Sequence, residues 1–529
     1  MRVPAAHPRF LRQREEAPSP EAAWLRPLAA INGRVQSPRK APMAYVVAGC
    51  LAVAALTLIL PTTPTYDPWG WILWGREIAH LDLTTTGGPS WKPLPVLFTT
   101  PFSLFGLHTA PYLWVLVARA GALLACVLAY RLARRIVGPS WYGLLAGVAA
   151  ALALFSSFKF VRDAALGNSE ALLAALALWS FERHLDGRRD HALYLGFAAA
   201  LLRPEVWPFL GAYGLWLWFK EPRLRVRMIV LGALIPALWF LPEWWGSGDP
   251  FRAGSRANNP NPGSAAFAQD PFVELLRRFR KVVIAPVKAG VVIATAWAVY
   301  RWFRYRREGL TLVVAGFGVA WFVLVAGMTQ AGFAGNQRYL ILSTVAVSVL
   351  GGVGAARVLQ GIGWLGRRAL GDRPRAGAAT ALVAFFVALF ASTPFIVEKA
   401  NNVGRVSGGL NHEAELWHDL KVLLERNGGK HALLTCGGVF SGPFQTQMVA
   451  YELGIHGIEI GWRTTPPPGV AFRTRTVPNG PLVTKPTDDR YRLIDRYGKW
   501  RLLTVPPPGK TACPKASPAA PTARPARVR

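Results

Sequence analysis

The chain has 529 residues, of which 52% are hydrophobic, and its mean hydropathy is +0.25. Apolar segments of about 20 residues recur, which is the length that crosses a bilayer as a helix. The segments are continuous rather than alternating, so a transmembrane β-barrel is excluded. The formal net charge is +31, but the basic residues cluster in short loops between the apolar segments. This pattern indicates membrane orientation and gives no reason to expect a nucleic-acid partner.

The first segments of the chain predict a tail, a span and a tryptophan-rich loop. Residues 1–42 are rich in Arg, Pro and Ala and are expected to form a disordered cytoplasmic tail. The first span is expected at 43–60, followed by an extracytoplasmic loop over 61–92 that contains Trp69, Trp71 and Trp74. Segment 93–107 is apolar, short and proline-containing, so we expect an interfacial helix there.

Ten further spans are predicted, which makes about eleven transmembrane helices. They lie at 112–130, 141–158, 165–181, 191–202, 206–219, 226–243, 283–300, 309–328, 338–358 and 377–395. Segment 191–219 is interrupted at Arg203-Pro204-Glu205 and could be one kinked helix or two short ones. One helix would place the basic stretches 220–227 and 301–307 outside, so the positive-inside rule favours two. The break between them would form the floor of a water-filled notch.

This topology places the N-terminus in the cytoplasm and the C-terminal region outside the cell membrane. The transmembrane domain is expected to cover 43–396, and 397–505 to form a small extracytoplasmic α/β domain. Within that domain we expect helices near 411–427 and 445–453, and strands near 431–435, 458–462, 491–495 and 500–505. Residues 506–529 are rich in Pro and Ala and are expected to be disordered. The fold class is therefore an all-α polytopic membrane protein with a small C-terminal α/β domain.

The four cysteines divide into two pairs. Cys50 and Cys126 lie in apolar segments and are expected to serve as packing. Cys436 and Cys513 lie in the polar C-terminal region. Export of that region would allow them to form a disulfide, and two unpaired thiols are the alternative.

Polar side chains interrupt the apolar segments at four places that the topology puts on the outer side. They are Asp67, the triplet Asn168-Ser169-Glu170, Arg203 with Glu205, and Asn336-Gln337-Arg338. Charged groups near the bilayer are costly and usually functional, so four clusters on one side indicate a site. Each cluster also has a structural interpretation. Asp67 suits a helix cap, and Arg338 with Tyr339 suits an interfacial anchor. Glu170 suits a structural ion pair, with Arg203, Glu205 and Arg338 available across the notch.

The residue types favour transfer chemistry at a phosphate. A carboxylate at the lip of the membrane, such as Asp67, can act as a general base toward a hydroxyl or an amine. Arg338 can bind a phosphate bidentately, and Lys92 can either bind a phosphate or extend its amine toward the membrane surface. The sequence contains no phosphate-binding glycine loop, zinc motif or serine-hydrolase elbow.

In this order the motifs resemble the GT-C superfamily of membrane glycosyltransferases, and most nearly the protein-mannosyltransferase and aminoarabinose-transferase type. The resemblance covers about 43–360. The matching motifs are Tyr66-Asp67-Pro68-Trp69, Lys92-Pro93-Leu94-Pro95, Arg119 with Arg131-Leu132-Ala133-Arg134-Arg135, Gly167–Glu170, Leu202–Glu205 and Arg338–Leu340. The chain departs from many relatives in having a single carboxylate near the membrane, with Asp82 well downstream. Metal dependence is therefore open: the sequence requires no cofactor, and a divalent cation stays an option.

The resemblance implies a sugar transferred from a polyprenyl-phosphate carrier to an unknown acceptor on the extracytoplasmic face, with inversion at the sugar. Asp67 would be the catalytic base and Arg338 would neutralise the lipid phosphate. The other implied substrate-binding residues are Lys92, Glu170, Arg203, Glu205 and Tyr339. Two alternatives stay open. Broken helices and buried charges also suit a transporter or lipid flippase, and the C-terminal domain also suits a non-catalytic envelope scaffold.

Overall fold

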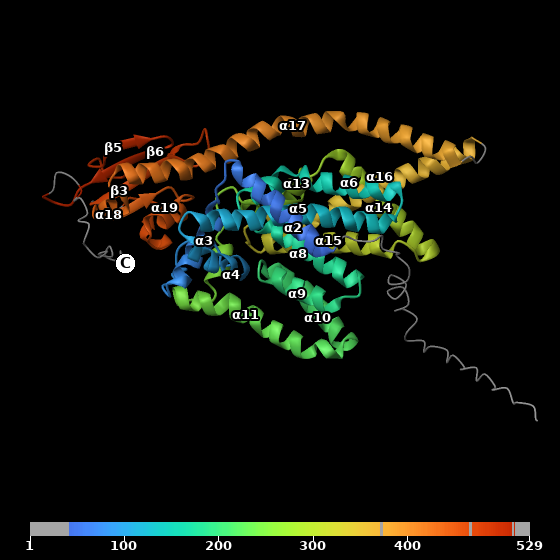
Figure 1. Cartoon of the computed structure of the whole chain (residues 1–529), viewed down its shortest axis with the longest axis horizontal. Coiled ribbons are helices and arrows are strands. Elements are labelled where there is room, and N and C mark those ends of the chain that lie inside the picture. The colour runs from blue at the N-terminus through green and yellow to red at the C-terminus, as the bar shows by residue number, and fades with distance from the viewer. Residues whose placement is uncertain (1–41, 371–373, 465–467, 510–512, 514–529) are drawn as a thin grey trace, which may run out of the picture.

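The computed structural model describes residues 42–370, 374–464, 468–509 and 513. The expected tails 1–42 and 506–529 lie outside this range, apart from Pro42, 506–509 and Cys513. Long helices run roughly parallel through most of the molecule, a small sheet lies at one end, and one helix, α17, extends along nearly the whole length (Figure 1). The chain is thus mostly helical with a C-terminal sheet, as predicted.

The segment predicted as a tryptophan-rich loop is partly a helix. After α2 (Met43–Leu56), helix α3 covers Tyr66–Ala79, and α4 covers Pro93–Phe102. All three tryptophans of α3 are buried, with at most 2% of each side chain exposed. A helix satisfies the backbone hydrogen bonds of such a buried, apolar segment. The expected loop 61–92 therefore contains a helix whose position was not predicted.

The remaining helices form the bundle. They are α5 (Thr109–Val137), α6 (Trp141–Phe155), α7 (Phe158–Ala165), α8 (Glu170–Leu185), α9 (Arg189–Ala200), α10 (Trp207–Lys220), α11 (Arg225–Ser247), α12 (Arg252–Ala257), α13 (Pro271–Phe279), α14 (Ala285–Tyr305), α15 (Gly309–Gln330), α16 (Ile341–Ala369) and α17 (Pro374–Arg426). The segment 191–219 is two helices, α9 and α10, as the charge argument favoured. Glycines bring α14 and α16 together, because a Cβ at Gly354 would clash with the carbonyl oxygen of Gly290.

The number of spans stays a prediction. Among the described residues, five helices are long and apolar enough to cross a membrane, or six if the bent pair α6–α7 counts as one span. The axes of α6 and α7 differ by 65°. Helices α9 and α10 have only 12 and 14 residues, about 18–21 Å at 1.5 Å per residue, and a bilayer core is about 30 Å thick.

Ion pairs join three of the loops that were expected to be cytoplasmic. Arg135 at the end of α5 binds Asp186 after α8 at 2.6 Å, and Arg131 binds Glu182 at 2.7 Å. Arg189 at the start of α9 binds Glu221 after α10. These basic loops therefore lie side by side, which is what a shared membrane side requires.

Helix α17 passes through the expected domain boundary at 396/397 without a break, and its last turns are the helix expected at 411–427. The strand expected at 431–435 was wrong, because Gly429–Leu434 forms α18 and the strand β1 follows at Gly438–Ser441. Helix α19 (Thr446–Leu453), β2 (Ile460–Gly461), β5 (Arg492–Tyr497) and β6 (Trp500–Val505) lie where elements were expected. Strands β3 (Gly469–Arg475) and β4 (Leu482–Val483) were not expected.

The sheet has the order β2-β1-β3-β6-β5, with β4 beside β3. The first three strands in this order are parallel, and β6 pairs antiparallel with both β3 and β5. Cys436 and Cys513 form a disulfide, which decides the alternative that the sequence left open.

One hydrophobic core joins the C-terminal sheet to the first outer segment. Trp69 of α3 packs on Trp417 of α17 and on Tyr451 of α19, with ring centroids 5.1 and 5.3 Å apart. The Arg76 guanidinium donates to the carbonyl oxygens of Tyr451 and Ile455 at 2.9 and 3.0 Å. The C-terminal region is therefore docked on the helices that carry Asp67 and Lys92.

Candidate active site

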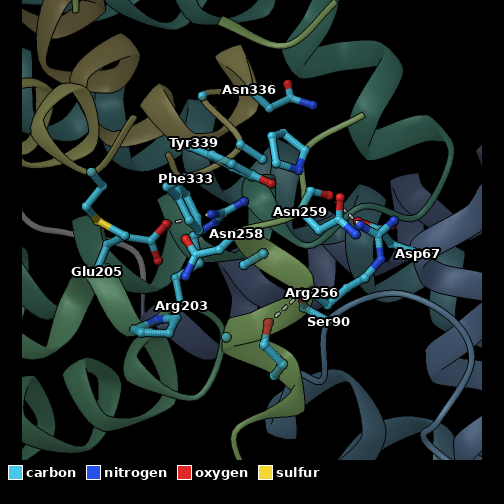
Figure 2. Close-up of a pocket in the computed structure, with 18 of the residues that line it drawn as sticks. Asp67, Ser90, Arg203, Glu205, Arg256, Asn258, Asn259, Phe333, Asn336 and Tyr339 are labelled. Carbon is cyan, nitrogen blue, oxygen red and sulfur yellow. Dashed lines mark hydrogen bonds and ion pairs between the residues drawn. The ribbon is translucent and has the colours of Figure 1, made fainter. Parts of the chain in front are cut away.

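Three of the four predicted polar clusters line one cavity of about 840 Å³: Asp67, Arg203 with Glu205, and Asn336-Gln337-Arg338. The triplet Asn168-Ser169-Glu170 is joined to it through contacts of Glu170 with Arg203 and Arg338. Its walls come from the start of α3, the turn between α9 and α10, the segment 250–264 around α12, and the segment 333–339 before α16. Figure 2 shows Asp67 on one side of the cavity and Glu205 with Arg203 on the other, with Arg256 and Asn258 between them.

Asp67 lies in the first turn of α3, directly before Pro68, where the helix N-terminus favours a carboxylate. Its Oδ2 accepts a hydrogen bond from Arg338 Nη2 at 2.5 Å. The Asp67 side chain is 17% exposed, and no hydrogen bond among the described residues uses its Oδ1. One carboxylate oxygen of this cavity-lining residue is thus held by a guanidinium, and the other has no hydrogen-bond partner among the described residues.

Glu170 is the first residue of α8, whereas the expected span 165–181 would place it about one turn inside the helix. The preceding turn ends at Gly167, whose φ of +79° suits a residue without a Cβ. One oxygen of Glu170, Oε1, lies 2.7 Å from Arg203 and 3.7 Å from both Lys92 and Arg338. The other oxygen, Oε2, is buried and has no hydrogen-bond partner in the described structure.

Arg203 lies in the break between α9 and α10, where an extended residue precedes Pro204. Its two terminal nitrogens bind different carboxylates, Glu205 at 2.8 Å and Glu170 at 2.7 Å. Its guanidinium carbon also lies 4.0 Å from the centre of the Tyr339 ring. Arg203 is only 4% exposed, so the break is filled by a compensated ionic cluster.

Lys92 caps the N-terminus of α4 and is 8% exposed. Its Nζ donates to Ser169 Oγ at 2.8 Å and lies 4.8 Å from the centre of the Trp71 ring. Burial lowers the pKa of Lys92 to about 8, although the neighbouring Glu170 carboxylate acts in the opposite direction. This amine therefore points inward and does not extend toward the membrane surface.

We call Lys92, Arg203 and Arg338 the cavity cations. Each has a carboxylate within 4 Å, and the carboxylates are Asp67, Glu170 and Glu205. Arg338 also donates to Asn168 Oδ1 at 3.0 Å. The structure thus brings all seven predicted site residues together, and it also forms the ion pairs of the structural interpretation.

The segment 250–264 was not predicted to belong to the site. Arg252 anchors it through two hydrogen bonds to Glu243, at 2.7 and 2.9 Å, and Thr85 donates to the same carboxylate at 3.1 Å. Arg256, Asn258 and Asn259 then line the cavity. The sequence signal was the run Asn-Asn-Pro-Asn-Pro-Gly at 258–263, which is typical of a turn-rich loop, but nothing in it indicates which cavity it faces.

The part of the chain that the structure describes holds no group of three or more His, Cys, Asp or Glu residues that could bind a metal ion together. Metal dependence therefore stays open, as it was from the sequence.

The fold is similar to that of ArnT from Cupriavidus metallidurans, solved in the apo state, with a TM-score of 0.52 and 14% sequence identity. The match covers 87% of this chain and 97% of that chain. No protein-family model and no curated protein sequence matches the chain. ArnT is an aminoarabinose transferase of the GT-C family, so the predicted resemblance is confirmed at the level of the fold.

Proposed function

We propose that this chain is a membrane glycosyltransferase that moves a sugar from a polyprenyl-phosphate carrier to an acceptor on the extracytoplasmic face. The observation that carries the proposal is the cavity of about 840 Å³ that is lined by the three cavity cations and by one accessible carboxylate, Asp67, which contacts Arg338. The ArnT-like fold supports the same reaction class.

In the proposed reaction Asp67 accepts the proton of the acceptor hydroxyl or amine while that atom attacks the anomeric carbon of the donor. The bond between the anomeric carbon and the phosphate oxygen breaks, and the electron pair leaves with the polyprenyl phosphate. A direct displacement of this kind inverts the anomeric configuration. The donor and the acceptor supply all the atoms and electrons of this step, so no further reactant is needed.

Arg338 is proposed to stabilise the departing phosphate, with Lys92 and Arg203 behind it. Fixed cations aimed at developing negative charge in a site of low dielectric are a large catalytic contribution. Arg338 contacts both Asp67 and Asn168, so it lies between the proposed base and the start of α8. Glu170 and Glu205 hold the cations in place in the absence of substrate.

The disulfide and the joined basic loops support the proposed sidedness. A disulfide between Cys436 and Cys513 is typical of an oxidising compartment. The loops carrying Arg135 and Arg189 suit the cytoplasmic side by the positive-inside rule. The cavity and the C-terminal region are accordingly proposed to face the extracytoplasmic space.

The test is donor turnover by the protein in nanodiscs, with a panel of radiolabelled polyprenyl-phosphate pentoses and hexoses. Asp67→Asn should lower turnover by about 10²–10⁴-fold, the usual contribution of a general base, while donor binding persists. Asp489→Asn, an exposed carboxylate of the C-terminal region, is the matched control and should act like wild type. Equal turnover in wild type and Asp67→Asn would remove Asp67 from the mechanism. Lipid movement across the bilayer without donor consumption would favour the flippase.

A further inference from the structure

Three arginines stand next to one another across the C-terminal sheet. Arg473 of β3 pairs directly with Arg501 of β6, and Arg501 pairs directly with Arg496 of β5. We call these three residues the arginine ladder. Neighbouring strands lie about 4.8 Å apart, so the ladder carries three positive charges over roughly 10 Å.

The arginine ladder lies on the face of the sheet that points away from α17. Side chains alternate along a strand, and Val470, Phe472 and Leu502 pack in the core that includes Leu416 and Trp417 of α17. Arg473 and Arg501 alternate with these residues, so they belong to the other face. The β5 strand has a register shift between Leu493 and Asp495, which returns Arg496 to the same face as Arg501.

No carboxylate compensates the arginine ladder. In the described residues no Asp or Glu oxygen lies within 4.0 Å of its guanidinium nitrogens, although other arginines of this region are paired, such as Arg490 with Asp488 and Arg426 with Asp495. Like charges directly opposite each other on a sheet are destabilising. The pKa of Arg473 is lowered, first by burial and then by the neighbouring Arg501.

Arg473 also has an unused donor. Its Nε is buried and has no hydrogen-bond partner in the described structure. A donor this deeply buried is out of reach of an anion on the surface, and the Nε atoms of Arg203 and Arg338 in the cavity are unpaired in the same way. The mutual repulsion of the three uncompensated charges is therefore the observation that indicates an anionic ligand.

We propose that the arginine ladder is a binding site for an anionic glycan that carries phosphate or carboxylate groups. Guanidinium forks match both groups in geometry and charge. A lipid headgroup fits less well. The opposite face of the sheet packs in one core with α17 and with Trp69 of α3. The arginine ladder therefore points away from the outer segment on which the sheet is docked. The site is independent of sugar transfer.

The experiment measures binding of a fluorescent phosphomannan oligosaccharide to the full-length protein in phosphatidylcholine nanodiscs, with the dephosphorylated oligosaccharide as the ligand control. Wild type should bind the phosphorylated form at least tenfold more tightly, and added salt should weaken that binding. Arg501→Gln and Arg473→Gln should each weaken it by about tenfold, the effect of losing one charge-assisted contact.

Arg492→Gln is the matched control, because it removes the same charge from β5 at a position that pairs with Thr504, on the α17 side of the sheet. It should change affinity by less than about twofold. Asp67→Asn should bind like wild type, which separates this site from the proposed transferase activity. Equal weakening by Arg492→Gln, or equal affinity for the two oligosaccharides, would overturn the proposal. Displacement by phosphatidylglycerol vesicles without any oligosaccharide binding would do the same.

A thermal unfolding curve of each variant distinguishes a ligand site from a structural role. Removing one of three mutually repelling charges should leave the melting temperature of the unliganded protein unchanged or raise it slightly. A lower melting temperature for Arg501→Gln, together with lost binding, would mean that the arginine ladder stabilises the sheet and would overturn the site.

Discussion

The cavity and the C-terminal sheet each gather three cationic side chains, but only the cavity pairs them with carboxylates. Arg203 in the cavity is 4% exposed and binds two carboxylates, whereas Arg496 on the sheet is exposed and binds none among the residues that the structure describes. Removing a charge from water is expensive unless a partner replaces the lost solvation. Deeply buried cations therefore need carboxylate partners. Cations on a partly solvated face can remain unpaired and available to a ligand.

The comparison also separates two ways of preparing for an anionic substrate. In the cavity a phosphate must share its cations with existing carboxylates, and the contact of Arg338 with Asp67 ties the proposed phosphate ligand to the proposed base. On the sheet no carboxylate of the described residues lies within 4.0 Å of the three guanidinium groups, although other arginines of this region are paired. Replacing an arginine in the cavity should therefore lower the melting temperature. Replacing one on the sheet should leave the melting temperature unchanged or raise it slightly.

The largest stability difference is expected for Arg203→Gln. It leaves Glu170 and Glu205 buried without their shared cation, and breaking a buried pair of this kind costs about 3–5 kcal/mol of unfolding free energy. Thermal unfolding in nanodiscs should show a clear loss of melting temperature. Arg501→Gln, the same substitution on the sheet, is the counterpart and should show none. Equal losses for the two variants would contradict the distinction between the regions.

Lys92 should give the donor affinity a pH limit. Its pKa of about 8 means that the amine loses its charge as the pH rises above 8, so the KM for the donor should rise by up to about tenfold per pH unit. The kcat at saturating donor should change less. Lys92→Arg keeps a cation throughout this range and should flatten the rise. A KM that stays constant to pH 9.5 in wild type would exclude Lys92 from donor binding.

The smallest effect is expected where the two regions meet. His456 after α19 lies 2.9 Å from Glu77 of α3 and 3.4 Å from Asp82. The hydrogen bond to Glu77 raises the pKa of His456, so its stabilisation is complete below pH 6.5 and is lost as the pH rises through the raised value. Burial also raises the pKa of Glu77. Stability should therefore also fall with rising pH as this carboxyl loses its proton, over a lower pH range. The contact of His456 with Glu77 and Asp82 should lose about 1 kcal/mol or less of its contribution to the free energy of unfolding.

The measurement for this joint is the melting temperature between pH 5.5 and 9, compared with His456→Asn. Wild type should lose stability with rising pH, and the variant should lose less because it has no titrating ring. A steeper loss in His456→Asn than in wild type would show that the joint does not depend on the protonated histidine.

Sequence patterns predicted the membrane class, the break between α9 and α10, and the four polar clusters. Each of these depends on local chemistry, such as apolar length, a proline after Arg203, or a charge that interrupts an apolar run. The same local reasoning did not predict the helix α3 within the loop 61–92, because its tryptophans are buried against the distant C-terminal region. It also failed for residues 431–435, which form the helix α18 before the strand β1.

The sequence by itself determined which residues are costly in a membrane and therefore need partners. Only the tertiary structure decided who the partners are, because contacts such as Asp67 with Arg338 join positions 271 residues apart. The arginine ladder is the clearest example, since strand register places Arg473 beside Arg501 and no periodicity along either strand encodes that pairing.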